Sequence, residues 1–174
     1  LTAVCTTGSL IAADGTWTAT TGGNWSDTAN WQDATSASGS GYTAYLTTGS
    51  GTITNEITDL ALRGIQLDGS GFTLAGNTIT LDSAGFITVS GGTHTVGLPL
   101  ALQGSTAVTA ASGQTLTLSG AISGNGGLTT SGGKVVLSNS GSSYLGNTVH
   151  SSGTLEFSSV AALGSTAAGL VLGD

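Results

Sequence analysis

The chain has 174 residues, including 30 glycines, one proline, one cysteine and no methionine, and only 6% of its residues are charged. Its net charge is −7, so it lacks the clustered lysine and arginine that binding to nucleic acid or anionic lipid requires. No run approaches the roughly 20 apolar residues of a membrane-spanning helix, which excludes insertion of that kind. Because 38% of the residues are hydrophobic and they recur in strand-like register, the composition favours a folded β domain over a disordered chain.

The first segment, residues 1–13, is uncharged and mildly apolar. We interpret it as a retained strand, although its end also resembles the cleavage site of a secretion signal. Such a strand can add to the exposed sheet edge of another copy. The single cysteine, Cys5, has no partner for an internal disulfide and is predicted to be an unpaired packing residue. The residues predicted to make the contact between copies are Leu1, Val4, Leu10 and Ile11.

Residues 14–41 contain all three tryptophans, Trp17, Trp25 and Trp31, among several asparagines and aspartates. Asparagine and aspartate side chains close tight turns, and indole rings cover the open end of a hydrophobic core. We therefore predict a cap over the first turn of the fold. The alternative is a platform on which the three indoles stack against a sugar. The end of this region, residues 34–41, is predicted to be a flexible surface loop.

From residue 42 to residue 174, short apolar strands alternate with corners rich in glycine, serine and asparagine. Apolar residues recur there at intervals of about 20 residues, as Leu74, Val96, Leu118, Leu137 and Phe157. Such a period with about three short strands predicts a parallel β-helix, because each turn buries its apolar face only by stacking on its neighbours. We expect these five side chains to form one interior line. An antiparallel β-sandwich would explain the strands but not the period.

A second series of apolar residues supports the same repeat. Leu81, Leu102 and Ile122 follow one another at nearly the same interval as the first series, which predicts that they stack on another face. Parallel crossovers are right-handed in nearly all proteins, so the predicted solenoid is right-handed.

Residues 126–157 carry the best-defined motif, GGLTTSGGKVVLSNSGSSYLGNTVHSSGTLEF. The segment resembles the autotransporter-associated β-strand repeat, also called the passenger-associated transport repeat. The pattern W…GNWSDxxNW in residues 17–31 is similar to the opening of long surface proteins that carry this repeat. The resemblance implies a parallel β-helix on a bacterial cell surface or in a secreted protein. It implies neither enzymatic activity nor a cofactor.

The residues that carry chemistry do not form a recognisable catalytic or metal-binding set. Asp68 and Asp82 are one strand and a corner apart, and nothing marks them as an acid–base pair of the glycosidase type. The interval between His94 and His150 is not a whole number of repeat periods, so we expect them on different faces, both facing solvent. Lys134 is interpreted as a solvated side chain. The sequence therefore predicts that the protein is not an enzyme and holds no metal.

The C-terminal stretch, residues 161–174, has no lysine or proline and carries an apolar strand. We expect a strand edge there that binds other strands, because an uncovered solenoid end has unpaired backbone groups and an exposed hydrophobic core. The predicted function is a structural, extracellular head-to-tail homopolymer forming a fibre or matrix filament. The alternatives are a monomeric adhesin or binding module for surface polysaccharide, and an enzyme acting on polysaccharide. The residues predicted for the C-terminal side of the contact are Leu163, Leu170, Val171 and Leu172.

Overall fold

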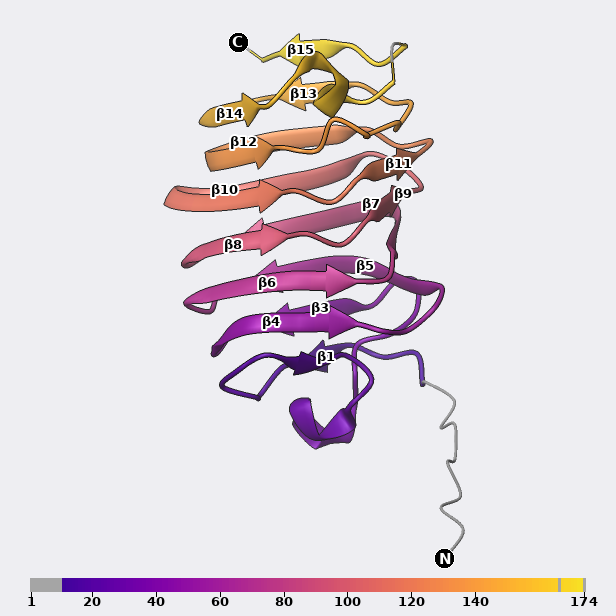
Figure 1. Cartoon of the computed structure of the whole chain (residues 1–174), viewed down its shortest axis with the longest axis vertical. Coiled ribbons are helices and arrows are strands. Elements are labelled where there is room, and N and C mark those ends of the chain that lie inside the picture. The colour runs from indigo at the N-terminus through magenta and orange to yellow at the C-terminus, as the bar shows by residue number, and fades with distance from the viewer. Residues whose placement is uncertain (1–10, 166, 174) are drawn as a thin grey trace, which may run out of the picture.

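The computed structural model describes residues 11–165 and 167–173 and shows a β-solenoid of about 6 turns, with about 21 residues in each turn (Figure 1). The strands belong to one 15-stranded sheet that winds around the core. The pairings between these strands are all parallel. This confirms the predicted parallel β-helix and excludes the antiparallel sandwich. Leu1, Val4, Cys5 and Leu10 lie outside the described residues.

The strand pairings define three faces. Face 1 contains β1 (Gly15–Thr16), β3 (Thr43–Leu46), β13 (Thr148–His150) and β15 (Leu170–Leu172). Face 2 contains β2 (Gly23–Asn24), β4 (Ser50–Asn55), β6 (Gly71–Gly76), β8 (Thr93–Val96) and β14 (Thr154–Phe157). Face 3 contains β9 (Leu100–Leu102) and β11 (Ile122–Gly124).

Four longer strands bend around a corner and contribute to two faces each. Two of them run from face 3 into face 1: β5 (Leu60–Leu67) and β7 (Ile79–Val89). Two run from face 1 into face 2: β10 (Thr106–Leu118) and β12 (Leu128–Leu137). The bends coincide with breaks in the pairing register, as between Ala110 and Thr115 of β10. Figure 1 shows the turns stacked along one axis, with β1 near one end and β15 at the other.

The interior of face 2 is one continuous line of apolar side chains. Leu74 pairs with Val96, Val96 with Leu118, Leu118 with Leu137, and Leu137 with Phe157, which confirms the predicted register. The first four are buried, since alternate strand residues face the core. Each buried aliphatic side chain contributes about 1.5–3 kcal/mol. Phe157 lies in the last strand of this face and remains 40% exposed.

Face 3 departs from the sequence prediction by two positions. Leu81 pairs with Leu102 as expected, but Ile122 pairs with Leu100, and Gly124 takes the place opposite Leu102. The prediction that Ile122 continues the Leu81 line was wrong because the turn that begins at Leu102 is complete only at Gly124, two positions beyond Ile122. A shift of two keeps the same side chains facing the core, which is why Ile122 is still buried.

One corner between faces 1 and 2 depends on glycine. Gly132 and Gly153 adopt φ values of +89° and +84°, a region that side chains with a Cβ atom rarely enter. A Cβ atom on Gly153 would also clash with the carbonyl oxygen of Gly132 in the turn below. Glycine therefore permits both the sharp corner and the close stacking of successive turns.

Candidate functional site

The last described turn leaves core-facing apolar side chains uncovered. In β15, Leu170 pairs with Thr148 and Leu172 pairs with His150. Thr148 is completely buried, so Leu170 and Leu172 continue lines of side chains that face the interior, yet they are 40% and 68% exposed. We call Phe157, Leu170 and Leu172 the open end. The described residues leave between 40% and 68% of each of these three residues exposed.

The backbone of β15 is also unpaired on its outer side. This strand pairs with β13 alone among the strands of the described residues. Its outer edge therefore presents free N–H and C=O groups at the same place as the uncovered apolar side chains. Val171, which lies between the two leucines, is 43% exposed and belongs to the alternate, outward-facing set of this strand. Ile11, on the opposite side of the predicted contact, is 79% exposed.

The short 3-10 helix η3 (Val160–Leu163) closes the third corner of this last turn. Leu163 is buried, so the prediction that it belongs to the exposed edge was wrong: the helix turns its side chain inward. The Thr148 hydroxyl donates to the Leu163 carbonyl at 3.4 Å and also contacts the Tyr144 hydroxyl. Burial raises the pKa of the Tyr144 phenol, and the hydrogen bond with Thr148 partly opposes this rise. These contacts hold η3 to the solenoid beside the open end.

The opposite end of the solenoid is closed by the three indoles, which form the cap. Trp17, Trp25 and Trp31 are at most 3% exposed. Trp31 packs against both others, with ring centroids 5.1 Å from Trp17 and 5.0 Å from Trp25. The Trp31 indole N–H donates to the Trp25 carbonyl at 2.7 Å. The alternative prediction of a ligand-stacking platform was therefore wrong, since the ring faces are occupied by protein.

The segment around the cap is ordered by turns and hydrogen bonds. Two 3-10 helices, η1 (Thr28–Asn30) and η2 (Gln32–Ala34), lie beside the indoles. The Trp25 indole N–H donates to the carbonyl of Ala37 at 2.9 Å, and Ala37 is completely buried. The prediction of a flexible surface loop at residues 34–41 was wrong because the indole needs this backbone acceptor. Ala13 pairs with Ser38 in an antiparallel bridge within the chain itself.

Carboxylates fasten the cap to the solenoid. Glu56 accepts hydrogen bonds from the backbone N–H groups of Trp25 and Ser26, at 3.1 and 3.3 Å, and from the Ser26 hydroxyl. Asp14 accepts one from the backbone N–H of Thr43 at 2.6 Å. An ionised carboxylate is purely an acceptor and binds N–H groups strongly. These two acids therefore have structural partners.

Some of the remaining charged side chains also have partners within the fold. Asp82 accepts a hydrogen bond from the backbone N–H of Gly41 at 2.9 Å, while Asp68 lies at another corner. Lys134 forms an exposed ion pair with Glu156 at 2.7 Å, so this lysine is both solvated and paired. Within residues 11–165 and 167–173, no group of three or more His, Cys, Asp or Glu side chains gathers to hold a metal ion.

The two histidines lie on different faces, as predicted, but His94 does not face solvent. It is 1% exposed, stacks on Phe72, accepts a hydrogen bond from the Phe72 N–H at 3.0 Å and donates to the Gly91 carbonyl at 2.6 Å. The prediction of a solvent-facing side chain was wrong because His94 has the same strand parity as the buried Val96. That parity was a signal the sequence offered. His150 is partly exposed and pairs with Thr130 at 3.0 Å.

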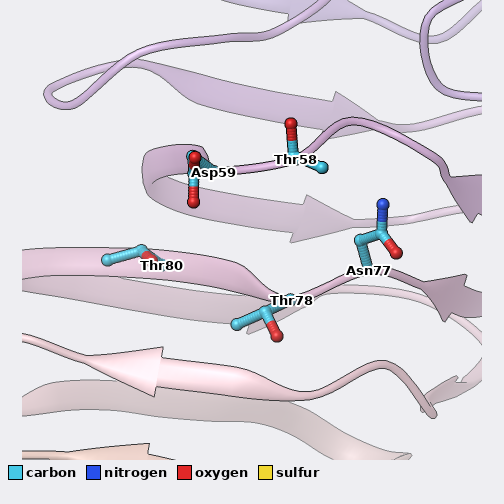
Figure 2. A pocket seen from close by; sticks show the side chains of 5 residues that line it. All are labelled: Thr58, Asp59, Asn77, Thr78 and Thr80. Carbon is cyan, nitrogen blue, oxygen red and sulfur yellow. The ribbon is translucent and has the colours of Figure 1, made fainter.

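One surface groove lies at the corner that leads into face 3 (Figure 2). Its side chains come from two neighbouring turns, and no sequence pattern marked it. Asp59 supplies the single carboxylate and adopts a φ of +57° in the turn before β5. No aromatic ring, imidazole or second carboxylate lines the groove, so it offers neither an acid–base pair nor a sugar-stacking surface. The lining residues are Thr58, Asp59, Asn77, Thr78 and Thr80.

Charge is distributed unevenly along the solenoid axis. Seven of the nine acidic residues lie in residues 1–82, against one arginine. In residues 83–173 the charged side chains are Lys134 and Glu156, which neutralise each other. The ninth acidic residue is Asp174, two positions beyond Leu172 in the sequence, so the half of the chain with the cap is strongly acidic and the other half only weakly so. The uncovered apolar side chains make the open end the strongest candidate for a functional surface.

No family model, no curated protein and no solved structure matches this chain. Among the residues that the structure describes, no helix has the length and apolar character needed to cross a membrane.

Proposed function

We propose that this protein is a structural β-solenoid, without enzymatic activity, that associates with other copies through its open end. The proposal rests on the exposure of Phe157, Leu170 and Leu172 on lines of side chains that are buried in the turns below. Apolar side chains in core-facing positions with free backbone beside them are unusual on a protein surface and mark an interaction site.

The repeat itself explains why this end binds another solenoid turn. Inside the molecule, each turn is stabilised by the apolar side chains and backbone N–H groups of the next turn. A β-strand laid on β15 would extend the same sheet and bury the same lines of side chains. The edge thus fits either a second copy or a further turn of the same repeat in a longer chain. In either case the partner is a solenoid turn, which presents the same kinds of apolar side chains and backbone groups.

The extracellular location belongs to this proposal and is supported by sequence. The resemblance of residues 126–157 to a repeat of bacterial surface and secreted proteins favours a role in a surface fibre or matrix filament. A hydroxyl-rich surface with 6% charged residues suits a protein that packs against itself. The three indoles are buried, so they do not support the alternative of a carbohydrate-binding module, which would have to use a face rich in threonine and serine.

Sedimentation velocity over a wide concentration range tests the proposal. We expect the wild type to associate as concentration rises and Leu172→Lys to stay monomeric, because an ammonium group at this core-facing position opposes burial. Ala29→Lys, on the exposed part of η1, adds the same charge at the capped end and is the matched control. The wild type remaining monomeric at every concentration, or Leu172→Lys associating as strongly as the wild type, would contradict the proposal.

A further inference from the structure

We propose that face 2 binds ice through a two-dimensional array of outward-facing threonines. The array occupies β4, β6, β8 and the second half of β10, on the side of the solenoid and not at the open end. The inference goes beyond the proposed function and does not depend on it. We call the array the threonine grid, and its members are Thr52, Thr73, Thr93, Thr95, Thr115 and Thr117.

The pairing register arranges the grid in two rows. The longer row takes one threonine from each of the four strands, and successive members pair directly: Thr52, Thr73, Thr95 and Thr117. The shorter row pairs Thr93 with Thr115, two positions earlier in the last two strands. Figure 1 shows β4, β6, β8 and β10 one above another on the side that faces the viewer.

The spacing of such a grid is set by β geometry. Neighbouring strands lie about 4.7–4.9 Å apart, and residues i and i+2 of one strand lie about 6.6–6.8 Å apart. Water molecules in hexagonal ice repeat at similar distances along two directions of the crystal. The grid therefore presents hydroxyl groups at intervals close to those of an ice surface.

The grid hydroxyls are available for bonds outside the chain. Three of the threonines, Thr52, Thr73 and Thr93, are exposed, and the other three are partly exposed. None of the six hydroxyls makes a hydrogen bond within residues 11–165 and 167–173, whereas on face 1 the hydroxyls of Thr109 and Ser131 bond each other at 3.1 Å. A free hydroxyl both donates and accepts hydrogen bonds, as a water molecule does.

The grid is also held rigidly. The side chain between the two threonines of β8 is His94, and the next inward residue, Val96, is buried in the continuous interior line of face 2. Threonine is branched at Cβ, so few rotamers are open to its hydroxyl and methyl groups. A surface that is already ordered loses little conformational entropy when it binds a solid.

The surroundings of the grid favour an uncharged, regular ligand. The other outward-facing positions of β4 and β6 carry neither charge nor an aromatic ring: Ser50, Thr54, Gly71 and Ala75. An ionic ligand would find no opposite charge there, and a sugar ring would find no aromatic face to stack on. The grid ends at β12, where Lys134 and Val136 take the two row positions.

Growth of a single ice crystal in a dilute solution of the protein tests the proposal. We expect the wild type to hold the crystal unchanged over a gap between its melting and growth temperatures, because adsorbed protein blocks the addition of water. Thr95→Lys, within the longer row, should lose this gap, because the longer charged side chain keeps the flat face from meeting the crystal. Should Thr95→Lys unfold, as judged by circular dichroism, Thr73→Lys in the same row replaces it.

The matched control is Thr88→Lys, because Thr88 is a partly exposed, outward-facing threonine of face 1. We expect this variant to keep the gap, and Leu172→Lys to keep it as well, since the open end is not involved. No gap in the wild type, or an equal loss in Thr88→Lys, would overturn the proposal. Binding of the wild type to crystalline cellulose without any effect on ice growth would show that the occupant is a polysaccharide and would also overturn it.

Discussion

The two ends of this solenoid differ in how far the described residues cover the hydrophobic core. At the N-terminal end, three indoles fill the core opening, two 3-10 helices lie beside them, and Glu56 and Asp14 fasten the segment by hydrogen bonds. At the C-terminal end, the repeat continues to β15 with its core-facing leucines uncovered. The cap departs from the repeat, whereas β15 belongs to a turn of the repeat.

A turn of the repeat therefore does not cover its own outer core face and strand edge. Interior turns pair on both edges, whereas a terminal turn of a repeat has one unpaired edge that needs a distinct terminal structure or a partner. Charge follows the same division, because seven of the nine acidic residues lie in residues 1–82. Substituting one side chain at each end compares how much the cap and the open end contribute to the free energy of unfolding. Stability must be measured at protein concentrations where the chain is monomeric.

The largest effect is expected at the cap. Trp25→Ala removes a completely buried indole and should lower the free energy of unfolding by about 3–5 kcal/mol. Leu172→Ala at the open end should lower it by less than about 1 kcal/mol, since its side chain is already 68% exposed. Urea unfolding followed by circular dichroism measures both. Equal losses at the two positions would remove the distinction between a closed and an open end.

The line of side chains within face 2 allows the interior to be compared with the open end. Leu118→Ala should cost about 2–5 kcal/mol, because the residue is buried between turns. Phe157→Ala, in the last turn of the same line, should cost less, and Thr117→Ala, pointing outward, should cost little. Equal effects of Leu118→Ala and Thr117→Ala on the unfolding midpoint would show that the register is wrong.

The two fully buried indoles of the cap allow a finer comparison. Trp25→Phe leaves the Ala37 carbonyl without its donor, and we expect a loss of about 1–3 kcal/mol beyond the change in packing. The Trp17 indole N–H has no hydrogen-bond partner among the described residues, so Trp17→Phe should cost less. Thermal unfolding of the two variants measures the difference. A larger loss for Trp17→Phe would contradict this hydrogen-bond assignment.

The smallest effect concerns pH and the turn beside the open end. The pKa of Tyr144 is raised above its ordinary value of 10.0, so the folded chain holds this proton after the unfolded chain has lost it. Stability contributed by the neutral phenol is therefore complete below pH 10 and is lost as the pH rises through 10 and above. Urea midpoints measured from neutral to strongly alkaline pH should show that Tyr144→Phe loses less stability than the wild type over this window. An identical loss in both proteins would remove Tyr144 as its cause.

The solenoid and its longest interior line could be predicted because both are repeated properties of the sequence. Apolar residues alternate within each strand, and the alternation returns after about one turn, so Leu74 to Phe157 align without knowledge of the corners. The same alternation places His94 on the buried side of its strand. Its burial was not predicted, because a histidine was expected to face solvent whatever its position in the strand.

Corners and ends were harder to predict because they do not repeat. The Ile122 register depended on the length of one turn, which no single strand reveals. Burial of Ala37 depends on the Trp25 indole N–H reaching its carbonyl, and burial of Leu163 depends on the inward rotation of η3. The open end was predicted in part. Leu170, Val171 and Leu172 are exposed there as expected, but the sequence did not show that the strand carrying Phe157 is the last of its face.

Hydrogen–deuterium exchange at low and high protein concentration would locate the contact between copies, because it reports which end of the wild-type chain becomes protected. We expect the backbone amides of β15 to exchange more slowly at high concentration, while those of η1 and η2 at the cap exchange at an unchanged rate. Protection gained at the cap, or no concentration dependence in β15, would contradict association through the open end.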